Sequence, residues 1–247
     1  SGIGKATARL LASKGRNLII TGRRKDRLED LAEDLEEQYD VIVEPLVFDI
    51  RNQIDIEKTI LAHKDKIENI EVLINNAGLA LGLDYIHEGN IDQWNTMIDT
   101  NIKGLLYMTR MISPYMVEKR KGHIINICST AGKEVYPKGN VYCATKFAVD
   151  ALTKAFRQDL HNFNIRVSQV APGHTENTEF ALVRFEGDDN KSKIYNDFNP
   201  LKSEDIANII DFIINQPPHV NIQDVLITST QQASSTLIDR TGRKFDK

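Results

Sequence analysis

A hydroxyl, a phenol and an ammonium group are spaced in residues 126–146 so that they could transfer a proton together. Ser129 follows a strand-like run at 123–128, and a loop with glycines and a proline separates it from Tyr142. Lys146 comes four residues after Tyr142 at the start of a helical pattern, which places both side chains on one helix face. A lysine cation beside a phenol favours the phenolate and lowers its pKa. We therefore predict Tyr142 as a general acid or base, with Ser129 donating a hydrogen bond to the same substrate oxygen.

An ordinary helix start with a surface lysine is the competing interpretation, and a Tyr-x-x-x-Lys pair alone would favour it. The upstream serine and the motifs below favour catalysis. Asn101 falls inside a long predicted helix, 91–119, where asparagine is a poor helix former and needs a local reason. It could perturb the helix and hold a water that relays protons to Lys146. The alternative is an exposed amide or one satisfied in the core.

Short apolar runs alternate with amphipathic helical patterns along the chain. The predicted strands are 18–20, 41–48, 72–74, 123–128, 165–170 and 225–227. The predicted helices are 5–13, 25–38, 54–67, 91–119, 140–161 and 206–214. This alternation predicts an α/β fold, a doubly wound Rossmann-type parallel sheet covered by helices on both faces. Because there is no linker or repeat, we predict one domain over 1–247, with an irregular excursion at 174–200 and a polar tail at 229–247.

The distinctive residues come at the ends of predicted strands, and in such sheets ligands bind at the carboxyl ends of the strands. Arg23, Asp49, Asn76, Ser129 and Pro172 all occupy such positions. This distribution predicts one binding site along a single edge of the sheet.

The segment Ser1-Gly2-Ile3-Gly4 opens a predicted helix, so backbone could approach a pyrophosphate at the positive end of the helix. The Rossmann fingerprint requires a preceding strand, which residues 1–247 lack, and a simple tight loop is the alternative. The position relative to the next strand favours a cofactor turn. Arg23 and Arg24 end that next strand, where an arginine accommodates the 2′-phosphate of NADP and an acidic residue would bind NAD. Two solvated charges are the alternative, and Asp26 lies nearby.

Two further strand ends have open interpretations. Asp49 and Ile50 could meet the adenine of a dinucleotide, or Asp49 could be the N-cap of the following helix. The run at 75–78, Asn-Asn-Ala-Gly, could support the cofactor ribose or could be a plain turn.

The composition argues against several classes of protein. Hydrophobic residues make up 41% and charged residues 27%, which is typical of a soluble globular protein. The net charge of −4 argues against nucleic acid or an anionic membrane as the main partner, and no apolar run approaches the roughly twenty residues of a membrane span. Cys128 and Cys143 indicate free thiols in a reducing cytosol, and the six histidines have no ligand spacing, so we predict no metal.

The chain resembles the short-chain dehydrogenase/reductase family over essentially its full length. The resemblance rests on Gly2/Gly4, 75–78, Asn101, Ser129, Tyr142/Lys146 and Pro172-Gly173, which occur in the family's order. It implies a catalytic tetrad of Asn101, Ser129, Tyr142 and Lys146. It also implies that Lys146 binds the nicotinamide ribose. The cofactor contacts that we expect are Ser1, Gly2, Ile3, Arg23, Arg24, Asp49, Ile50, Asn76, Tyr142, Lys146, Pro172, Gly173, Thr175 and Thr178.

Within the family the chain is most similar to NADP-dependent 3-hydroxy acid dehydrogenases, which act on L-allo-threonine, serine and related acids. That likeness rests on 79–82, 178–180, 183–185 and the excursion at 174–200. It implies a cytosolic homotetramer, packed partly through the helices that carry Asn101 and Tyr142. The family begins with a strand before its glycine-rich turn. We therefore expect residues 1–247 alone to bind NADP poorly or to be unstable, and the chain completed by that strand to be active.

These observations predict reversible oxidation of a 3-hydroxy acid to a 3-oxo acid by NADP, with the proton passing through Tyr142. Arg184 is the candidate for binding the substrate carboxylate, because its planar fork suits a carboxylate. An exposed arginine on a flexible lid is an equally good interpretation of that residue. A 3-oxoacyl or general carbonyl reductase, and a catalytically silent NADP-binding protein, are the competing functions.

Overall fold

Six parallel strands form the centre of the protein, which is described here from a computed structural model covering residues 1–188 and 194–245. Four of them form one sheet in the order β3–β4–β5–β8, and β1 pairs with β2 in a second, two-stranded sheet. The bounds are β1 Leu18–Gly22, β2 Val43–Val47, β3 Val72–Asn75, β4 Gly122–Ile127, β5 Ile165–Pro172 and β8 Asp224–Ile227. A short parallel pair, β6 Thr175–Glu176 and β7 Leu201–Lys202, stands apart.

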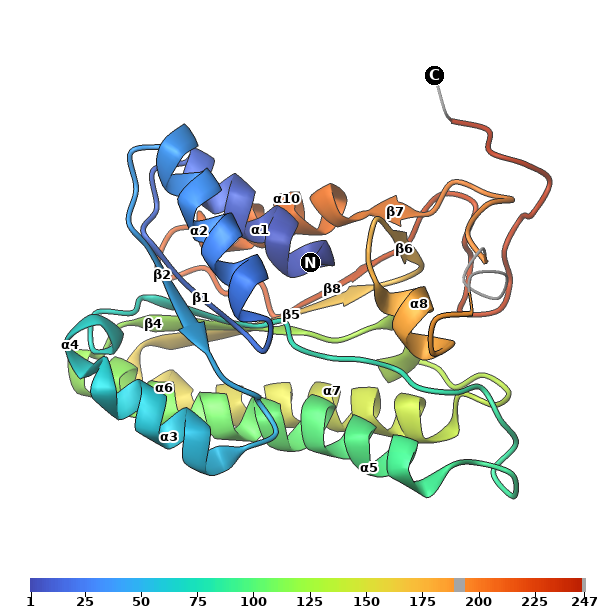
Figure 1. Ribbon diagram of the computed structural model, residues 1–247, viewed down its shortest axis with the longest axis horizontal. Coiled ribbons are helices and arrows are strands. Elements are labelled where there is room, and N and C mark those ends of the chain that lie inside the picture. The colour runs from blue at the N-terminus through green and yellow to red at the C-terminus, as the bar shows by residue number, and fades with distance from the viewer. Residues whose placement is uncertain (189–193, 246–247) are drawn as a thin grey trace.

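Helices cover both faces of the strands (Figure 1). On one side lie α1 Gly2–Ser13, α2 Lys25–Gln38 and α10 Ser203–Ile214, with α1 and α10 packed against each other. On the other side lie α3 Gln53–Ala62, α5 Ile91–Ile98, α6 Leu105–Lys119 and α7 Asn140–Leu160. The short helices are α4 Lys64–Ile67 and α8 Phe180–Arg184, the latter near the carboxyl ends of the strands. The predicted α/β fold with a parallel sheet is confirmed.

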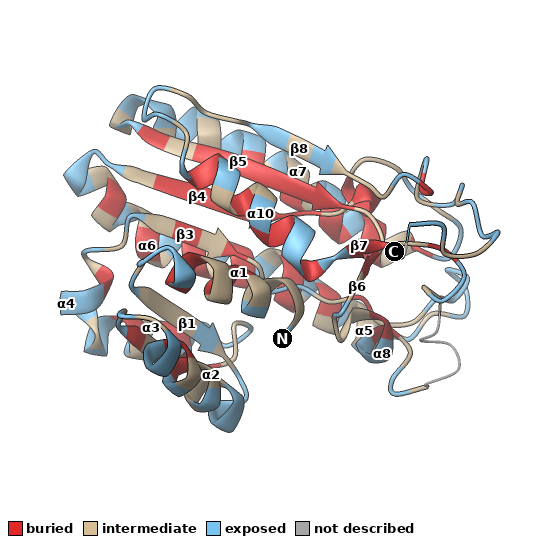
Figure 2. Cartoon of the chain, turned by 90° about the horizontal axis from the view of Figure 1, so that it is seen from above, coloured by how far each residue is buried: buried red, intermediate tan, exposed pale blue. Residues whose placement is uncertain are grey.

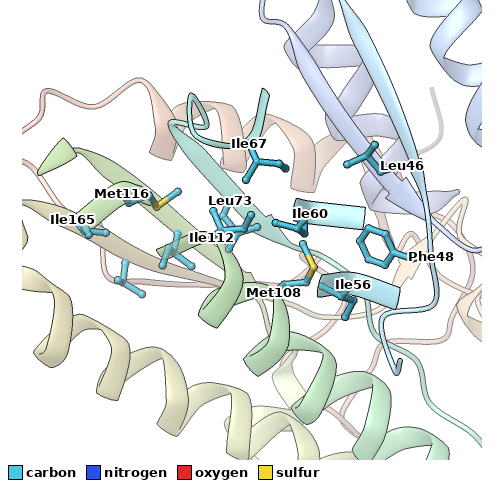
Figure 3. Close-up of a cluster of buried hydrophobic side chains, with 12 residues drawn as sticks. Leu46, Phe48, Ile56, Ile60, Ile67, Leu73, Met108, Ile112, Met116 and Ile165 are labelled. Carbon is cyan, nitrogen blue, oxygen red and sulfur yellow. The ribbon is translucent and has the colours of Figure 1, made fainter. Parts of the chain in front are cut away.

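The apolar core follows from the spacing of residues within each element. Met108, Ile112 and Met116 recur every four residues on α6, so they share one face (Figure 3). That face belongs to the same core cluster as Ile124 of β4. A second cluster joins Ile125 of β4 to the buried face of α10. Because β4 and β5 carry apolar residues on both faces, they are the most buried strands (Figure 2).

The predicted elements are present, with changes at their ends. The predicted helix 54–67 is divided at His63 into α3 and α4. The predicted helix 91–119 contains a π-helical segment, η1 Asp99–Gly104. Asn52 caps α3 by accepting hydrogen bonds from the backbone amides of Ile54 and Asp55, at 3.1 and 3.3 Å. The alternative that Asp49 is the N-cap is therefore wrong.

The predicted polar tail packs against the predicted excursion. Gln232 Oε1 accepts a hydrogen bond from the His174 backbone amide at 2.9 Å, and Gln231 Oε1 accepts one from the Asn199 amide at 2.9 Å. Both glutamine side chains are buried, so this part of the tail is structural rather than free. Residues 189–193 of the excursion and 246–247 of the tail lie outside the described residues.

Two absences hold for the described residues, 1–188 and 194–245. No helix there has the length and apolar character that crossing a bilayer requires. No group of three or more His, Cys, Asp or Glu side chains there could hold a metal ion.

The parallel strands are interrupted between β1 and β3, which do not pair with each other. A cavity of about 1480 Å³ reaches into this interruption, where Ile20 of β1 and Ile74 of β3 line it. Among the described residues, the edges of β1 and β3 at this interruption have no strand partner. A parallel strand there would connect through α1 to β1 by a right-handed crossover. It would also pair with the free edges of both strands.

We expect an apolar, strand-forming extension upstream of Ser1 to raise the stability of the chain. Backbone pairing and apolar burial worth about 3 kcal/mol would raise the Tm of a domain of this size by roughly 6–12 °C. Differential scanning calorimetry on the chain with and without the extension measures this. An extension of equal length with proline at alternate positions is the matched control, and equal Tm values for the two extensions would contradict a paired strand.

Candidate active site

Ser129 lies directly after β4, at the carboxyl edge of the sheet. Its backbone is extended, and its hydroxyl accepts a hydrogen bond from the Ala131 amide at 3.1 Å, which fixes the side chain at the first turn of the 3₁₀ segment η2 Thr130–Gly132. The same hydroxyl lies close enough to the phenol of Tyr142, which is buried on α7, to favour a lower pKa of that phenol. The structure therefore brings the predicted serine and tyrosine into direct contact.

The acidity of Tyr142 differs from the prediction. Burial raises the pKa of its phenol well above the ordinary value, and the neighbouring Tyr136 acts in the same direction. The Ser129 hydrogen bond and the positive charge of Arg184 oppose this rise. The prediction that Lys146 brings the pKa of Tyr142 down is wrong for this arrangement, in which Lys146 is not among the main influences on the phenol.

Lys146 is turned toward the sheet rather than into solvent. Its ammonium donates a hydrogen bond to the Ile127 carbonyl at 3.0 Å, and burial lowers its pKa. The nitrogen also lies against Gly78, 3.2 Å from where a β-carbon on that residue would be. Lys146 thus occupies the floor of the site, between the strand end that precedes Ser129 and the 75–78 turn.

Asn101 has a local structural reason for its place in a helix. It lies in the π-helical segment η1, which interrupts the regular helix as the sequence suggested. Its amide nitrogen donates to the Leu79 carbonyl at 2.8 Å and to Thr145 Oγ1 at 3.0 Å, and its oxygen accepts from the Leu79 amide at 2.9 Å. Asn101 therefore ties the segment after the 75–78 turn to α7, one residue before Lys146. The proton-relay water stays a prediction.

The loop that carries Ser129 is clamped to α7 at close range. A β-carbon on Gly132 would lie 2.7 Å from the Lys146 carbonyl oxygen, so only glycine permits this approach. The Cys128 thiol donates to the same carbonyl at 3.3 Å. One side of α7, the helix that carries Tyr142, is thus held by close contact against the loop that carries Ser129.

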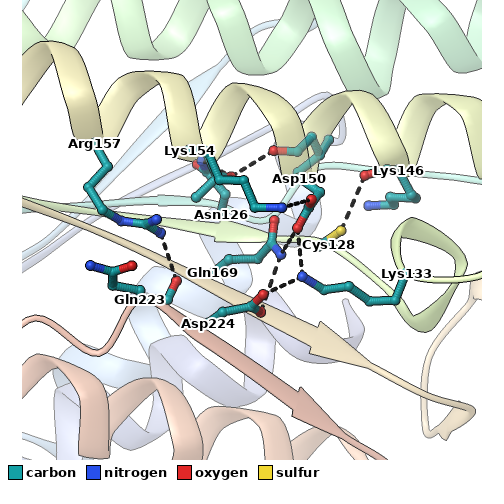
Figure 4. A network of polar contacts seen from close by, with 12 residues as sticks. Asn126, Cys128, Lys133, Lys146, Asp150, Lys154, Arg157, Gln169, Gln223 and Asp224 are labelled. Carbon is teal, nitrogen blue, oxygen red and sulfur yellow. Dashed lines mark hydrogen bonds and ion pairs between the residues drawn. The ribbon is translucent and has the colours of Figure 1, made fainter.

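An ionic network attaches the loop that carries Ser129 to α7 at a second place (Figure 4). Lys133, directly after η2, donates to Asp150 Oδ1 on α7 at 2.6 Å and also bonds Asp224 of β8. Burial acts in the opposite direction, but hydrogen bonds from Lys133, Lys154 and Gln169 lower the pKa of Asp150 to about 2. The carboxylate therefore stays ionised at neutral pH, and the network ties the loop to α7 and to β8.

The cofactor-side residues surround the N-terminal end of α1. Gly4 lies so close to Asn76 that a β-carbon there would be 2.7 Å from the Asn76 amide nitrogen, and a β-carbon on Gly2 would be 3.1 Å from Thr178. Ile50 packs against Gly104 of η1. All of these except Gly104 line the cavity that reaches Tyr142. The positive end of α1 faces this space, as an anion site requires.

The two arginines of the predicted phosphate site differ in their contacts. Arg24 donates to Ser1 Oγ at 3.2 Å and to Glu179 Oε2 at 2.8 Å, and Arg27 bonds the other oxygen of Glu179. Hydrogen bonds from Arg24 and Arg27 lower the pKa of Glu179 to about 2, against the effect of burial. Arg23 has a looser ion pair, 3.9 Å from Asp49. The Arg23 side chain is therefore held less tightly by other residues than the Arg24 side chain.

Asp49 is held by its neighbour in sequence. Arg51 donates to both carboxylate oxygens, with Nη2 to Oδ2 at 2.6 Å, and this hydrogen bonding lowers the pKa of Asp49. Asp49 lines the cavity, where the charged carboxylate could accept a hydrogen bond from an adenine amino group.

Arg184 lies at the opposite end of the site, beside Tyr142. It is only 9% exposed, and its guanidinium lies 5.6 Å from the ring centroid of Tyr142 and 5.6 Å from that of Tyr136. Nε donates to the Gly82 carbonyl at 3.2 Å and Nη1 to the Tyr136 hydroxyl at 3.0 Å. Nη2 is buried with no hydrogen-bond partner among residues 1–188 and 194–245. The alternative of an exposed arginine is therefore wrong.

The structure gathers the predicted site residues around one cavity. Every predicted catalytic, cofactor and substrate residue lines it except Asn101, which lies behind Leu79 and Lys146. The residues that line it are Ser1, Gly2, Ile3, Arg23, Arg24, Asp49, Ile50, Asn76, Ser129, Tyr142, Lys146, Pro172, Gly173, Thr175, Thr178 and Arg184.

Sequence reasoning missed two residues that make important contacts. Tyr136 precedes Tyr142 by six residues in a loop with proline and glycine, and nothing in that spacing marks it as a partner of Arg184. Glu179 is 155 positions from Arg24, so no local pattern could reveal their ion pair. The one sequence feature that points to Glu179 is its negative charge within 178–180, a segment that carries the family likeness.

The sequence matches the family described as short chain dehydrogenase over residues 1–188, and the chain belongs to that family. The NADP-dependent 3-hydroxy acid dehydrogenase YdfG of Salmonella typhi is 44% identical over 238 residues, 96% of this chain and 94% of that protein. The NADP-dependent 3-hydroxy acid dehydrogenase of Schizosaccharomyces pombe is 41% identical over 242 residues, 97% and 93% of the two chains.

Solved structures give the same result. The closed form of serine dehydrogenase complexed with NADP⁺ has a TM-score of 0.89 and 40% identity, with 96% of this chain and 95% of that chain covered. Serine dehydrogenase from Escherichia coli has a TM-score of 0.80 and 37% identity, with 94% and 95% covered. The family resemblance predicted from the sequence motifs is confirmed.

We expect Lys133→Met to lower kcat about tenfold, because a loosened serine loop misplaces the hydroxyl beside Tyr142. The Kd for NADP should stay within about twofold, since the cofactor-side residues are on other elements. Lys133→Arg should keep most of the activity. Lys154→Met is the matched control, because Lys154 also bonds Asp150, at 2.5 Å, but from α7 itself. Steady-state kinetics and a cofactor titration measure these values, and an equal loss of kcat in the Lys154 variant would contradict the role of the loop attachment.

Proposed function

We propose that the protein reversibly oxidises a 3-hydroxy acid, such as L-allo-threonine or serine, to the 3-oxo acid, with NADP as the hydride acceptor. The observation that carries this proposal is the unpartnered, buried Nη2 of Arg184 beside the Ser129–Tyr142 pair. A buried guanidinium with a free nitrogen favours a carboxylate ligand. The names of the relatives from Salmonella typhi and Schizosaccharomyces pombe support the same substrate class.

The chain's own residues have separate tasks in this reaction. Bound NADP supplies the nicotinamide ring that accepts a hydride from the carbinol carbon. Tyr142 accepts the hydroxyl proton during oxidation and returns it during reduction. Ser129 donates a hydrogen bond to the same oxygen and holds it within reach of Tyr142. Lys146 binds the nicotinamide ribose from its buried position beside the 75–78 turn.

NADP fits the arginines at the end of β1 better than NAD does. Arg23 and Arg24 both line the cavity there, and a guanidinium suits a phosphate dianion. The first turn of α1, with the close glycine approaches at Gly2 and Gly4, suits the pyrophosphate. The NADP complex of serine dehydrogenase supports this choice by its likeness to the chain.

The chain is also proposed to work as a homotetramer in the cytoplasm, as a single domain over 1–247. Ile98 of α5, Leu106 of α6 and Phe147 of α7 are 36%, 36% and 41% exposed. These helices lie side by side on one face of the protein (Figure 1), where apolar exposure suits contact with a second copy. Sedimentation velocity tests the proposed assembly.

We expect Tyr142→Phe to lower kcat by about 10³-fold or more, because the ring stays but the proton donor and acceptor is removed. Binding of NADPH, followed by its fluorescence, should remain within about threefold of the unaltered chain. A variant that keeps near-normal turnover would rule out proton transfer by Tyr142.

We expect Arg184→Gln to raise the KM for a 3-hydroxy acid about 10- to 100-fold, the cost of one or two lost hydrogen bonds to a charged group. The KM for NADP should not change by more than about twofold. The assay follows NADPH absorbance with L-allo-threonine, L-serine and a 3-oxoacyl ester. A chain that prefers the ester would instead indicate the competing carbonyl reductase function. A chain inactive with all three while still binding NADP would indicate a silent binding protein.

We expect Arg23→Asp to shift the cofactor preference from NADP toward NAD by about 100-fold in kcat/KM, because the variant repels a 2′-phosphate and accepts from a 2′-hydroxyl. Arg9→Asp on α1 is a surface charge control away from the cavity. Kinetics with both cofactors at fixed substrate give the ratio, and an unchanged ratio in the Arg23 variant would refute the 2′-phosphate assignment.

A further inference from the structure

The contacts of Arg184 hold its guanidinium in place and leave one buried nitrogen without a hydrogen-bond partner among the described residues. The bond from Nη1 to the Tyr136 hydroxyl and the bond from Nε to the Gly82 carbonyl hold two of its three nitrogens. The third, Nη2, is buried without a partner among the described residues. A long, flexible side chain is thus held in one orientation by two attachments, and one of them is a side-chain hydroxyl.

Tyr136 is itself rigidly placed, so it can act as a fixed support. A β-carbon on Gly139 would lie 2.5 Å from the Tyr136 ring, which shows how closely the ring packs on the first turn of α7. The Tyr136 hydroxyl is also hydrogen-bonded to the Cys143 side chain, and the ring packs on a buried cluster that contains Tyr142 and Cys143. Tyr136 packs on the start of α7, the helix that carries Tyr142. Through Tyr136, Arg184 is therefore held in a fixed position relative to the proposed proton-transfer residue.

The guanidinium lies between the two tyrosine rings, 5.6 Å from each ring centroid. An anion bound at Nη2 is therefore held next to the oxygen that Tyr142 and Ser129 contact. In a 3-hydroxy acid, a single carbon separates the carboxylate from the carbinol carbon. A short spacing of that kind suits an anion-binding nitrogen fixed close to the catalytic phenol.

We propose that Tyr136 is a positioning residue that gives the site its preference for an acid over an uncharged analogue, by holding Arg184 with Nη2 toward the substrate. This inference rests on the proposed function, in which Arg184 binds the substrate carboxylate. Without the Tyr136 hydroxyl, Nη1 loses its fixed partner and the guanidinium can rotate about its remaining bond to Gly82. The carboxylate then binds an arginine that has to be ordered first, which costs affinity for acids alone.

The test compares a short 3-hydroxy acid with its methyl ester, using the ratio of their kcat/KM values. In the unaltered chain this ratio should favour the acid. In Tyr136→Phe it should fall about tenfold or more, through a higher KM for the acid, while kcat and the kcat/KM of the ester stay within about twofold. The phenylalanine keeps the ring, so packing against Gly139 and Arg184 is preserved. Tyr115→Phe on α6, which does not line the cavity, is the matched control and should leave the ratio unchanged.

A double-mutant cycle separates an effect through Arg184 from general loosening. In an Arg184→Gln background, Tyr136→Phe should cause no further fall in the acid-to-ester ratio, because the group that it positions is gone. A further fall of the same size would overturn the inference. Thermal unfolding and NADP binding establish that each variant is folded.

The outcomes distinguish this inference from the proposed function. If the unaltered chain shows no preference for the acid, the carboxylate assignment of Arg184 fails and the inference fails with it. If the unaltered chain prefers the acid and Arg184→Gln loses that preference while Tyr136→Phe keeps it, the proposed function stands and the role of Tyr136 is wrong.

Discussion

The contact between the serine loop and α7 is the constraint on which the site depends. Proton transfer requires Ser129 and Tyr142 to reach one substrate oxygen, although a loop with little regular structure lies between them in the chain. The backbone of Gly132 lies directly against the carbonyl of Lys146, and Lys133 attaches the end of the same loop to Asp150 one turn further along α7. Neither contact involves the side chain of Ser129 or Tyr142, yet together they hold the loop that carries one against the helix that carries the other.

Opposing effects act on Tyr142 within this framework. Removal from water favours the neutral phenol, and positive charge nearby favours the phenolate. In this protein burial dominates, and the nearby cation that acts on the phenol most clearly is Arg184 rather than Lys146. In the proposed function Arg184 also binds the substrate carboxylate, so carboxylate recognition and proton transfer would share one guanidinium. A carboxylate bound there would neutralise part of the charge that eases ionisation of the phenol, and electrostatics would couple the two functions.

The parts of the structure that depend on local sequence were predicted well. The apolar periodicity of α6 and the short apolar runs of β4 and β5 determine those elements, because side-chain period and burial are properties of a short segment. Asn101 was recognised as unfavourable in a helix, and it lies in the π-helical segment. The polar tail was misjudged, because polarity says nothing of the partners that bury Gln231 and Gln232.

The sequence predicted which residues belong to the candidate site better than it predicted the contacts between them. Motif spacing identified residues that line the cavity, and several of them, such as Arg23, Asp49 and Ser129, follow a strand in a parallel sheet. It could not reveal that burial outweighs Lys146 at the Tyr142 phenol, because burial comes from residues distant in sequence. The same limit applies to Tyr136 and Glu179, whose partners lie 48 and 155 positions away.

Glu179 bonds arginines of the cofactor side from the residue that directly precedes α8. That short helix ends in Arg184, so in the proposed function its two ends lie near two different ligands. A phosphate that draws Arg24 and Arg27 away from Glu179 changes the restraint on the helix that presents Arg184. Such coupling is reciprocal. If the phosphate changes the affinity of the protein for a ligand at Arg184, that ligand changes the affinity for the phosphate by the same factor. The carboxylate of Glu179 thus connects the arginines at the end of β1 to the helix that carries Arg184.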